Sequence, residues 1–126
     1  MLFSACFLVP PFQTAEASTA FVQCGKASWY ALTSMTASGE RADPNVLAAA
    51  HRTLPFGTLV KVSNLRNGRE ITVRINDRGP FVKGRVIDVT KAVAHKLGFL
   101  PQGVAKVRIT VAGADGKALK GPGCGK

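Results

Sequence analysis

Short runs of alternating apolar and polar residues recur along most of the chain, separated by glycine-rich turns. Alternation with a period of two places the apolar side chains on one face of an extended segment, so each run predicts a half-buried strand. The predicted strands are Ala27–Tyr30, Thr58–Asn64, Glu70–Ile75, Arg85–Val89 and Ala105–Val111. The chain is therefore expected to be mainly β.

Turn and capping signals connect these runs. Arg66-Asn67-Gly68 lies between the second and third predicted strands, and Asn-Gly tolerates the positive φ of a tight turn, so these strands should pair as a hairpin. One helix is predicted after the fourth strand, with Thr90 as its N-cap and Gly98 as its stop. Its apolar face consists of Ala92, Val93, Ala94 and Leu97.

Many short strands with one covering helix predict a small closed or nearly closed barrel, because closure removes exposed strand edges. At 126 residues the chain supports one domain with one modest core. Residues 18–112 are expected to form this barrel. Residues 113–126 are rich in glycine and poor in apolar residues, and they are expected to form a C-terminal tail.

The N-terminal segment has the pattern of an export signal. Met1 to Phe12 is apolar and uncharged, and Ala15-Glu16-Ala17 matches the A-x-A pattern of a signal peptidase site, although no basic residue precedes the apolar run. Residues 1–17 are therefore expected to be a signal peptide, and the apolar run is too short to span a bilayer. The alternative is a lipid anchor at Cys6, whose flanking residues depart from the usual lipoprotein box. Either signal predicts export, which in a bacterium leads to the periplasm or cell envelope.

Cleavage after Ala17 would leave two cysteines, Cys24 and Cys124. In an exported domain, cysteines near opposite ends suggest a disulfide that closes a long loop, with two independent thiols as the alternative. Neither belongs to a C-x-x-C pair, and His51 and His95 show no ligand spacing. No metal and no other cofactor is expected.

The chain is strongly basic. Seventeen Lys and Arg against seven Asp and Glu give a formal net charge of +10, which attracts anionic polymers such as nucleic acid or bacterial cell wall. The basic residues are dispersed, and no helix-turn-helix, zinc-finger or RNA-recognition pattern occurs. Nucleic acid is therefore not expected as a partner.

The segment Arg74–Phe81, which reads Arg-Ile-Asn-Asp-Arg-Gly-Pro-Phe, marks a candidate for chemistry. Gly79-Pro80 must end the third predicted strand, because proline lacks a backbone donor and glycine supplies the dihedral angles of a sharp turn. Asp77 therefore stands at the mouth of a strand. It could carry chemistry, or it could merely cap the turn through its own backbone.

Five motifs occur in a fixed order around this residue: Lys26–Tyr30, Thr36–Glu40, Ala48–Gly57, Asn76–Phe81 and Gly84–Val89. Together they resemble the rare lipoprotein A family of bacterial septal-ring lytic transglycosylases, over roughly Gly25 to Val111. The resemblance implies a six-stranded double-psi β-barrel with one or two short helices. It also implies a lyase that cleaves the glycan strands of peptidoglycan.

The resemblance implies that Asp77 is the catalytic acid and that Glu40 and His51 are further site residues. A lytic transglycosylase needs no water nucleophile, because the muramic acid O6 hydroxyl closes on C1 and forms a 1,6-anhydro sugar. One carboxyl can therefore act first as acid and then as base. This role favours partial burial of Asp77 and requires Arg74 and Arg78 to point away from its carboxylate, toward substrate anions.

Other motif residues are candidate contacts to the glycan: Trp29, Tyr30, Ser38, Arg52, Asn76 and Arg78. Sugar rings stack on aromatic faces, although Trp29 would serve the core equally well. Glu40 is either a second carboxyl for an oxocarbenium-like transition state or a solvated turn residue. His51 either bonds Asp77 or the sugar, or is structural. Asp88 is interpreted as structural, with Arg85 or a backbone cap as its expected partner.

Three functions remain open. The first is a lytic transglycosylase that uses Asp77 to cleave the β-1,4 bond between N-acetylmuramic acid and N-acetylglucosamine. The second is a non-catalytic, expansin-like module that binds glycan and loosens the wall. The third is an inverting glycosidase that pairs Asp77 with Glu40 or Asp43, which requires carboxyls about 6.5–9.5 Å apart. Many relatives carry a C-terminal glycan-binding repeat domain, for which this chain has no residues left, so septal recruitment stays open. A monomer is the default expectation.

Overall fold

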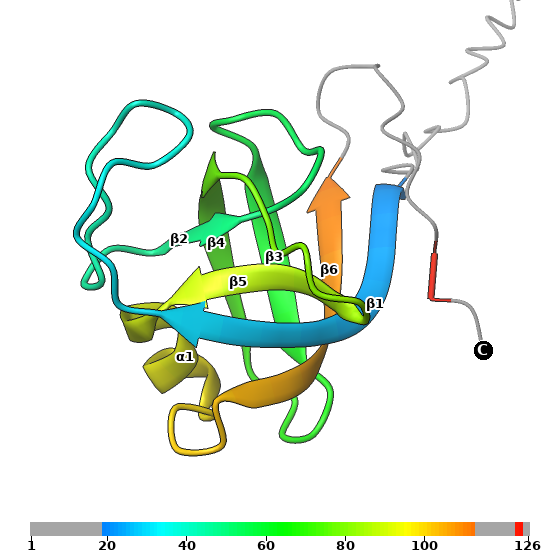
Figure 1. Ribbon diagram of the computed structural model, residues 1–126. Coiled ribbons are helices and arrows are strands. Elements are labelled where there is room, and N and C mark those ends of the chain that lie inside the picture. Colours follow the sequence, from blue (N-terminus) through cyan, green and yellow to red (C-terminus); the bar gives the residue numbers. More distant parts are fainter. Residues whose placement is uncertain (1–18, 113–122, 125–126) are drawn as a thin grey trace, which may run out of the picture.

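A computed structural model describes residues 19–112 and 123–124, which form one closed barrel with one short helix (Figure 1). The strands are β1 (Thr19–Tyr30), β2 (Ala48–Ala50), β3 (Leu59–Asn64), β4 (Glu70–Asp77), β5 (Arg85–Thr90) and β6 (Val104–Ala112), and the helix is α1 (Lys91–Leu97). The strands close in the order β1-β5-β2-β4-β3-β6. The prediction of a mainly β, closed barrel is confirmed.

The barrel mixes parallel and antiparallel pairs. β1 runs parallel to β5 and β2 runs parallel to β4, whereas the remaining neighbours are antiparallel. The six strands and their crossed order are those of a double-psi β-barrel, as predicted. The antiparallel pair of β1 and β6 begins where Thr19 lies beside Ala112.

Alternation located five of the six strands. β1 begins at Thr19 rather than at Ala27, and β4 continues past Ile75 to Asp77. The sixth strand, β2, was not predicted, because its three alanines are all buried and show no alternation. β2 is held instead by its neighbours β4 and β5 on either side.

The β3–β4 hairpin is confirmed, with Val62 beside Ile71 in its register. Gly68 alone provides the positive φ, at 77°, whereas Asn67 keeps a negative φ. The Asn67 amide instead donates to the Leu97 carbonyl oxygen at 2.9 Å. Asn67 therefore joins the hairpin turn to the end of α1.

Helix α1 is confirmed, and it ends at Gly98, whose φ of 80° is left-handed. Thr90 stands at the N-cap, but its side chain does not cap the helix. Its hydroxyl donates to the Val46 carbonyl oxygen at 2.5 Å, in the long loop between β1 and β2. The buried face of α1, which includes Val93 and Leu97, covers one end of the barrel (Figure 1).

The barrel interior holds the main apolar core. It is built from aliphatic side chains at alternate strand positions, together with the apolar face of α1. Its fully buried members include Val60, Val62, Val73, Ile75, Ile87, Val89, Val93, Leu97, Val107 and Ile109. Chemistry is therefore confined to the loops, the strand ends and the outer faces of the strands.

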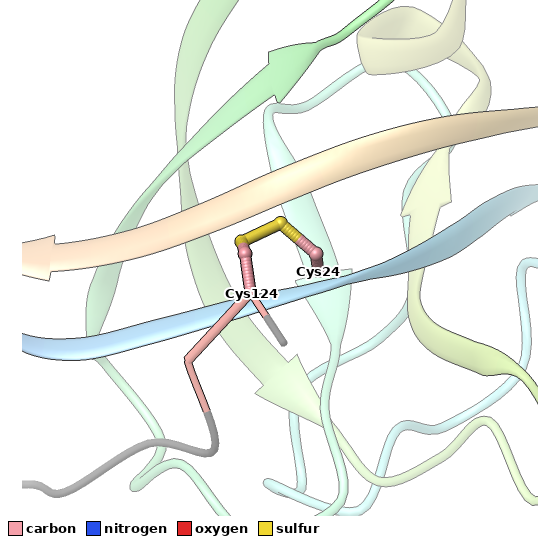
Figure 2. The surroundings of a disulfide bond; sticks show 2 residues. All are labelled: Cys24 and Cys124. Carbon is pink, nitrogen blue, oxygen red and sulfur yellow. A yellow bond between two sulfur atoms is a disulfide. The ribbon is translucent and has the colours of Figure 1, made fainter. Parts of the chain in front are cut away.

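Cys24 of β1 and Cys124 form a disulfide across a sequence separation of 100 residues (Figure 2). Beside it, the Gly123 N–H donates to the Val22 carbonyl oxygen at 2.6 Å. Closing a loop of this length restricts the unfolded chain and is worth about 4–5 kcal/mol on chain-entropy arguments. The predicted signal peptide, Cys6 and most of the predicted tail lie outside the described residues.

Helix α1, at seven residues, is the longest helix in the described part of the chain, and no helix there is long and apolar enough to cross a membrane.

Candidate active site

Asp77 is the last residue of β4 and is partly buried. Gly79, whose φ of 122° suits glycine, follows two positions later, so Asp77 stands at the mouth of the strand as the sequence predicts. Asp77 Oδ1 accepts hydrogen bonds from the Arg78 N–H and the Ala37 N–H, both at 2.9 Å. The bond from the Arg78 N–H is the one expected if Asp77 merely caps its own turn. The second brings a distant loop onto the carboxylate.

The two arginines that flank Asp77 point away from its carboxylate. Arg74 Nη2 lies 2.8 Å from Glu40 Oε1. Arg78 Nη1 donates to the carbonyl oxygens of His51, at 3.2 Å, and Leu54, at 2.9 Å. No ion pair among residues 19–112 and 123–124 includes Asp77. A catalytic acid at Asp77 requires Arg74 and Arg78 to point away from its carboxylate, and both arginines do so.

The Glu40 carboxylate is held by two side chains of β4. Its Oε1 accepts from Arg74 and also from Asn76 Nδ2 at 2.5 Å. These two donors, Arg74 first, hold the pKa of Glu40 below its usual range, so the side chain is an anion at neutral pH. Asn76 is 2% exposed, and it precedes Asp77 directly. Glu40 therefore fixes the end of β4.

Ser38 is part of a bonded turn in the same loop. Its hydroxyl pairs with Thr36 Oγ1 at 2.9 Å, and Thr36 Oγ1 donates to the Glu40 carbonyl oxygen at 2.7 Å. The Ser38 N–H donates to the Asn76 carbonyl oxygen at 3.3 Å. These bonds attach the loop to the strand that carries Asp77.

His51 directly follows β2 and is 3% exposed. Its Nδ1 accepts from the Thr53 and Leu54 N–H groups, both at 3.1 Å, so the ring proton is on Nε2, which lies 2.9 Å from Gln23 Oε1. Burial, together with nearby arginine charge, lowers the pKa of His51 to about 4. The ring makes no hydrogen bond to the Asp77 carboxylate. The His51 N–H instead donates to the Asp77 carbonyl oxygen at 3.1 Å.

The remaining basic candidate, Arg52, braces the loop that follows Asp77. Its Nε donates to the Pro80 carbonyl oxygen at 2.5 Å, and its Nη2 donates to those of Val82, at 3.1 Å, and Arg85, at 3.3 Å. Arg78 binds backbone carbonyls in the same way, and its guanidinium lies 4.0 Å over the Phe56 ring. In this structure both arginines hold the backbone of the loops around Asp77 in place.

The two aromatic candidates have different surroundings. Trp29 is partly buried, packs against the core and donates from Nε1 to the Leu100 carbonyl oxygen at 3.1 Å, so in this structure it serves the packing of the barrel. Tyr30 is half-buried, and burial, followed by the charges of Asp77, Asp88 and Glu40, raises its pKa to about 12. The Tyr30 hydroxyl is therefore protonated and lies close to carboxylates.

Two residues of this region, Phe81 and Asp88, are not among the site residues predicted from the sequence. Phe81 is 80% exposed, the largest exposure among the described large hydrophobic residues, and its ring lies 3.6 Å from the position that a Cβ on Gly79 would occupy. Asp88, interpreted as structural, accepts from the Ser28 hydroxyl rather than from Arg85. The signal that could have found both was their position inside the motifs.

Among the described residues, no three His, Cys, Asp or Glu side chains group together, so these residues offer no obvious metal site. Asp43, the other carboxyl considered, accepts from the Asn45 N–H at 2.9 Å within its own turn. The geometry therefore offers a carboxylate at a strand mouth, held by backbone donors and kept apart from cations.

Comparison with known proteins places this geometry in a family. Residues 22–109 match the family model described as lytic transglycolase. The probable endolytic peptidoglycan transglycosylase RlpA of Nostoc sp. is 60% identical over 78 residues, which are 62% of this chain and 21% of that protein. The endolytic peptidoglycan transglycosylase RlpA of Neisseria meningitidis is 50% identical over 103 residues, which are 79% of this chain and 41% of that protein. The chain thus spans less than half the length of these relatives.

Two solved structures share the fold. The Streptomyces papain inhibitor has a TM-score of 0.60 at 28% identity, covering 71% of this chain and 94% of its own. An expansin of Clavibacter michiganensis has a TM-score of 0.60 at 19% identity, covering 76% of this chain and 53% of its own. Because the family model covers most of the barrel and the five motifs predict the same group, the chain belongs to the lytic transglycolase family, as a double-psi β-barrel of the rare lipoprotein A type.

Proposed function

We propose that this chain is an endolytic peptidoglycan lytic transglycosylase. It cleaves the β-1,4 bond between N-acetylmuramic acid and N-acetylglucosamine and leaves 1,6-anhydromuramic ends. The observation that carries the proposal is the Asp77 carboxylate, which is fixed by two backbone N–H donors and has no cation against it in the described part of the chain. The relatives named as peptidoglycan transglycosylases support the same reaction.

The orientation of Asp77 suits an acid that later acts as a base. Both N–H donors bind Oδ1, so Oδ2 is the oxygen that carries the proton. Oδ2–H protonates the glycosidic oxygen as the bond to C1 breaks, and positive charge develops on the sugar ring. The O6 hydroxyl of the same muramic acid then attacks C1 and returns its proton to Oδ2. The carboxyl is regenerated, and no water is consumed.

The other motif residues hold this carboxyl in place. Glu40, through Asn76, and His51, through its N–H, fix the end of β4 from two sides. Arg52 and Arg78 brace the backbone on either side of the strand end. Catalysis of this kind depends on positioning, so these residues contribute although their side chains do not reach the carboxylate.

Tyr30 and Phe81 are the aromatic contacts that we assign to the glycan. The Tyr30 hydroxyl stays protonated and can donate to a sugar oxygen. Phe81 exposes its ring beside Gly79, two positions beyond Asp77, and aromatic faces of this kind stack on sugar rings. The protein acts as a monomer after export to the cell envelope, where its basic charge favours the anionic wall.

The test is mass spectrometry of the soluble products released from peptidoglycan and from peptide-free glycan by the wild type and by Asp77→Asn. Anhydromuramic ends from the wild type, and none from a folded Asp77→Asn, support the proposal. Reducing ends would identify a hydrolase instead. Binding without release by either protein would identify a wall-binding module.

A further inference from the structure

We propose that Asp88 is a second catalytic carboxylate of this site. Held by Ser28, it faces the sugar ring from across β2 and stabilises the positive charge that develops while Asp77 donates its proton. This inference rests on the function proposed above. It changes the interpretation of Asp88 from a structural residue to one that meets the substrate.

The strand register brings the two aspartates together. Ala50 of β2 lies beside Asp77 of β4 on one side and beside Asp88 of β5 on the other, and Asp88 lies beside Ser28 of β1. The four residues form one row across adjacent strands. Side chains at paired positions share a face, so both carboxylates stand over one alanine, with Cα atoms about 10 Å apart at two strand spacings.

A β-bulge makes this row possible. Ala49 pairs with Ile75, but Ala50 pairs with Asp77, so Asn76 is the extra residue of β4. Without the bulge, Asn76 would lie beside Ala50 and Asp77 would turn to the other face of the sheet. Bulges recur next to active sites because they redirect one side chain in this way. Here the bulge turns Asp77 toward the face that carries Asp88.

Both aspartates lack a cationic partner among the described residues, although the chain has seventeen Lys and Arg. The nearby arginines are bound elsewhere: Arg74 pairs with another carboxylate, and Arg52 and Arg78 bind backbone carbonyls. A carboxylate with a purely structural role gains from an adjacent cation. An unpaired one leaves its negative charge for a cation that forms on the substrate.

Ser28 and Tyr30 complete this half of the site. Ser28 is 7% exposed and its hydroxyl donates to Asp88 Oδ1, which fixes the carboxylate and leaves Oδ2 for the substrate. Tyr30 follows two positions later on the same face of β1 and lies close enough to feel the charges of Asp77 and Asp88. Asp88 takes no part in the proton transfer. No bond forms to it, and the proton moves only between Asp77 and the sugar oxygens.

The test compares Asp88→Asn with the wild type for release of anhydromuramic products, binding to peptide-free glycan and thermal unfolding. Asparagine keeps an oxygen for the Ser28 hydroxyl, so a structural role would survive the change. We expect kcat to fall about 100-fold or more while KM and binding change less than about threefold. Ser28→Ala should lower kcat about tenfold, and Ser28→Thr should restore it. Glu70→Gln, at an exposed ion pair with Lys61, is the control and should match the wild type.

Wild-type turnover by a folded Asp88→Asn overturns the inference, as does a loss of binding equal to the loss of turnover. If Asp88→Asn does not fold, Ser28→Ala decides, and an unchanged kcat in that variant overturns the inference. A wild type that releases no anhydro product overturns the proposed function and this inference together. An active wild type with an active Asp88→Asn overturns this inference alone.

Discussion

The Ala37 N–H donates a hydrogen bond of 2.9 Å to Asp77 Oδ1, across 40 positions of the chain. A loop that follows β1 thereby orients a carboxylate at the end of β4. The loop is itself attached to β4 through Ser38 and Glu40. The position of the acid is therefore a property of two distant segments together.

This bond makes Asp77→Asn a clean variant. The asparagine oxygen can still accept from Ala37 and Arg78, so the fold and glycan binding should be unchanged, whereas the proton donor is lost. We expect release of anhydromuramic products to fall by about 10³-fold or more. Product mass spectrometry and thermal unfolding check this. Activity within tenfold of the wild type would exclude Asp77 as the acid.

Glu40→Gln tests the ion pair with Arg74. The change releases the Arg74 guanidinium, which can then turn toward Asp77 and hold it as an ion pair. We expect turnover to fall about tenfold or more with binding retained, and little change in stability because the pair is exposed. The double variant Glu40→Gln/Arg74→Gln should recover part of the loss. A double variant no more active than Glu40→Gln would show that the carboxylate itself is needed.

His51 should make stability depend on pH. Its pKa is lowered to about 4 in the fold, against an ordinary value of 6.5, so the unfolded state binds the proton more readily. The stabilisation is present above pH 6.5 and is lost as pH falls toward 4, by about 2–3 kcal/mol at pH 4.5. Denaturant unfolding at pH 7 and pH 4.5 measures it.

The matched comparison for this pH effect uses both histidines. His51→Gln should lower stability at pH 7, because it removes the acceptor for Thr53 and Leu54, and should flatten the loss between the two pH values. His95→Gln, on the exposed side of α1, should keep the wild-type pH dependence. The same slope in all three proteins would show that His51 is not the group that titrates.

Phe81→Ala should weaken glycan binding about 3- to 10-fold, because an exposed ring beside the acid is lost as a stacking surface. Phe81→Trp should bind at least as well as the parent. Binding is best measured in the Asp77→Asn background, where no product forms. Leu65→Ala, at a residue 51% exposed in the β3–β4 turn, is the control for general loss of apolar surface. Equal weakening by both alanine variants would contradict a specific role for Phe81.

Retention on isolated cell wall should weaken with salt. The chain has a formal net charge of +10, and exposed charges are screened within about 3 Å at 1 M salt against about 8 Å at 0.15 M. We expect most of the bound protein to elute between these concentrations. Retention that is unchanged at 1 M salt would show that the contacts to glycan, rather than charge, hold the protein on the wall.

Local patterns predicted most of the fold. Alternation located β1 and β3 to β6, and turn residues located the hairpin and the end of α1. β2 was not predicted because its three alanines show no alternation, although it lies between β4 and β5, the two strands that carry Asp77 and Asp88. The strand order is set by long-range pairing, which leaves no local mark in the sequence.

The motifs identified the site residues but not their partners. Ser28 and Asp88 are 60 positions apart, and the bulge at Asn76 is invisible in an alternating run. Trp29 and Tyr30 are adjacent in the sequence, yet Trp29 packs against the core and Tyr30 lies beside the carboxylates, because neighbours in a strand face opposite ways. Such distinctions depend on register, which the three-dimensional pairing decides.

The pairing of Thr19 with Ala112 places the first and last strand residues one strand spacing apart, about 5 Å. The Cys24–Cys124 bond fastens the chain at the same strand. A polypeptide can therefore enter and leave the barrel at a single point, and a circular permutant with its ends joined there and reopened at Asn67-Gly68 would keep every strand pair. The barrel is suited to be carried as an insert within a larger protein, with its carboxylates undisturbed by what flanks it.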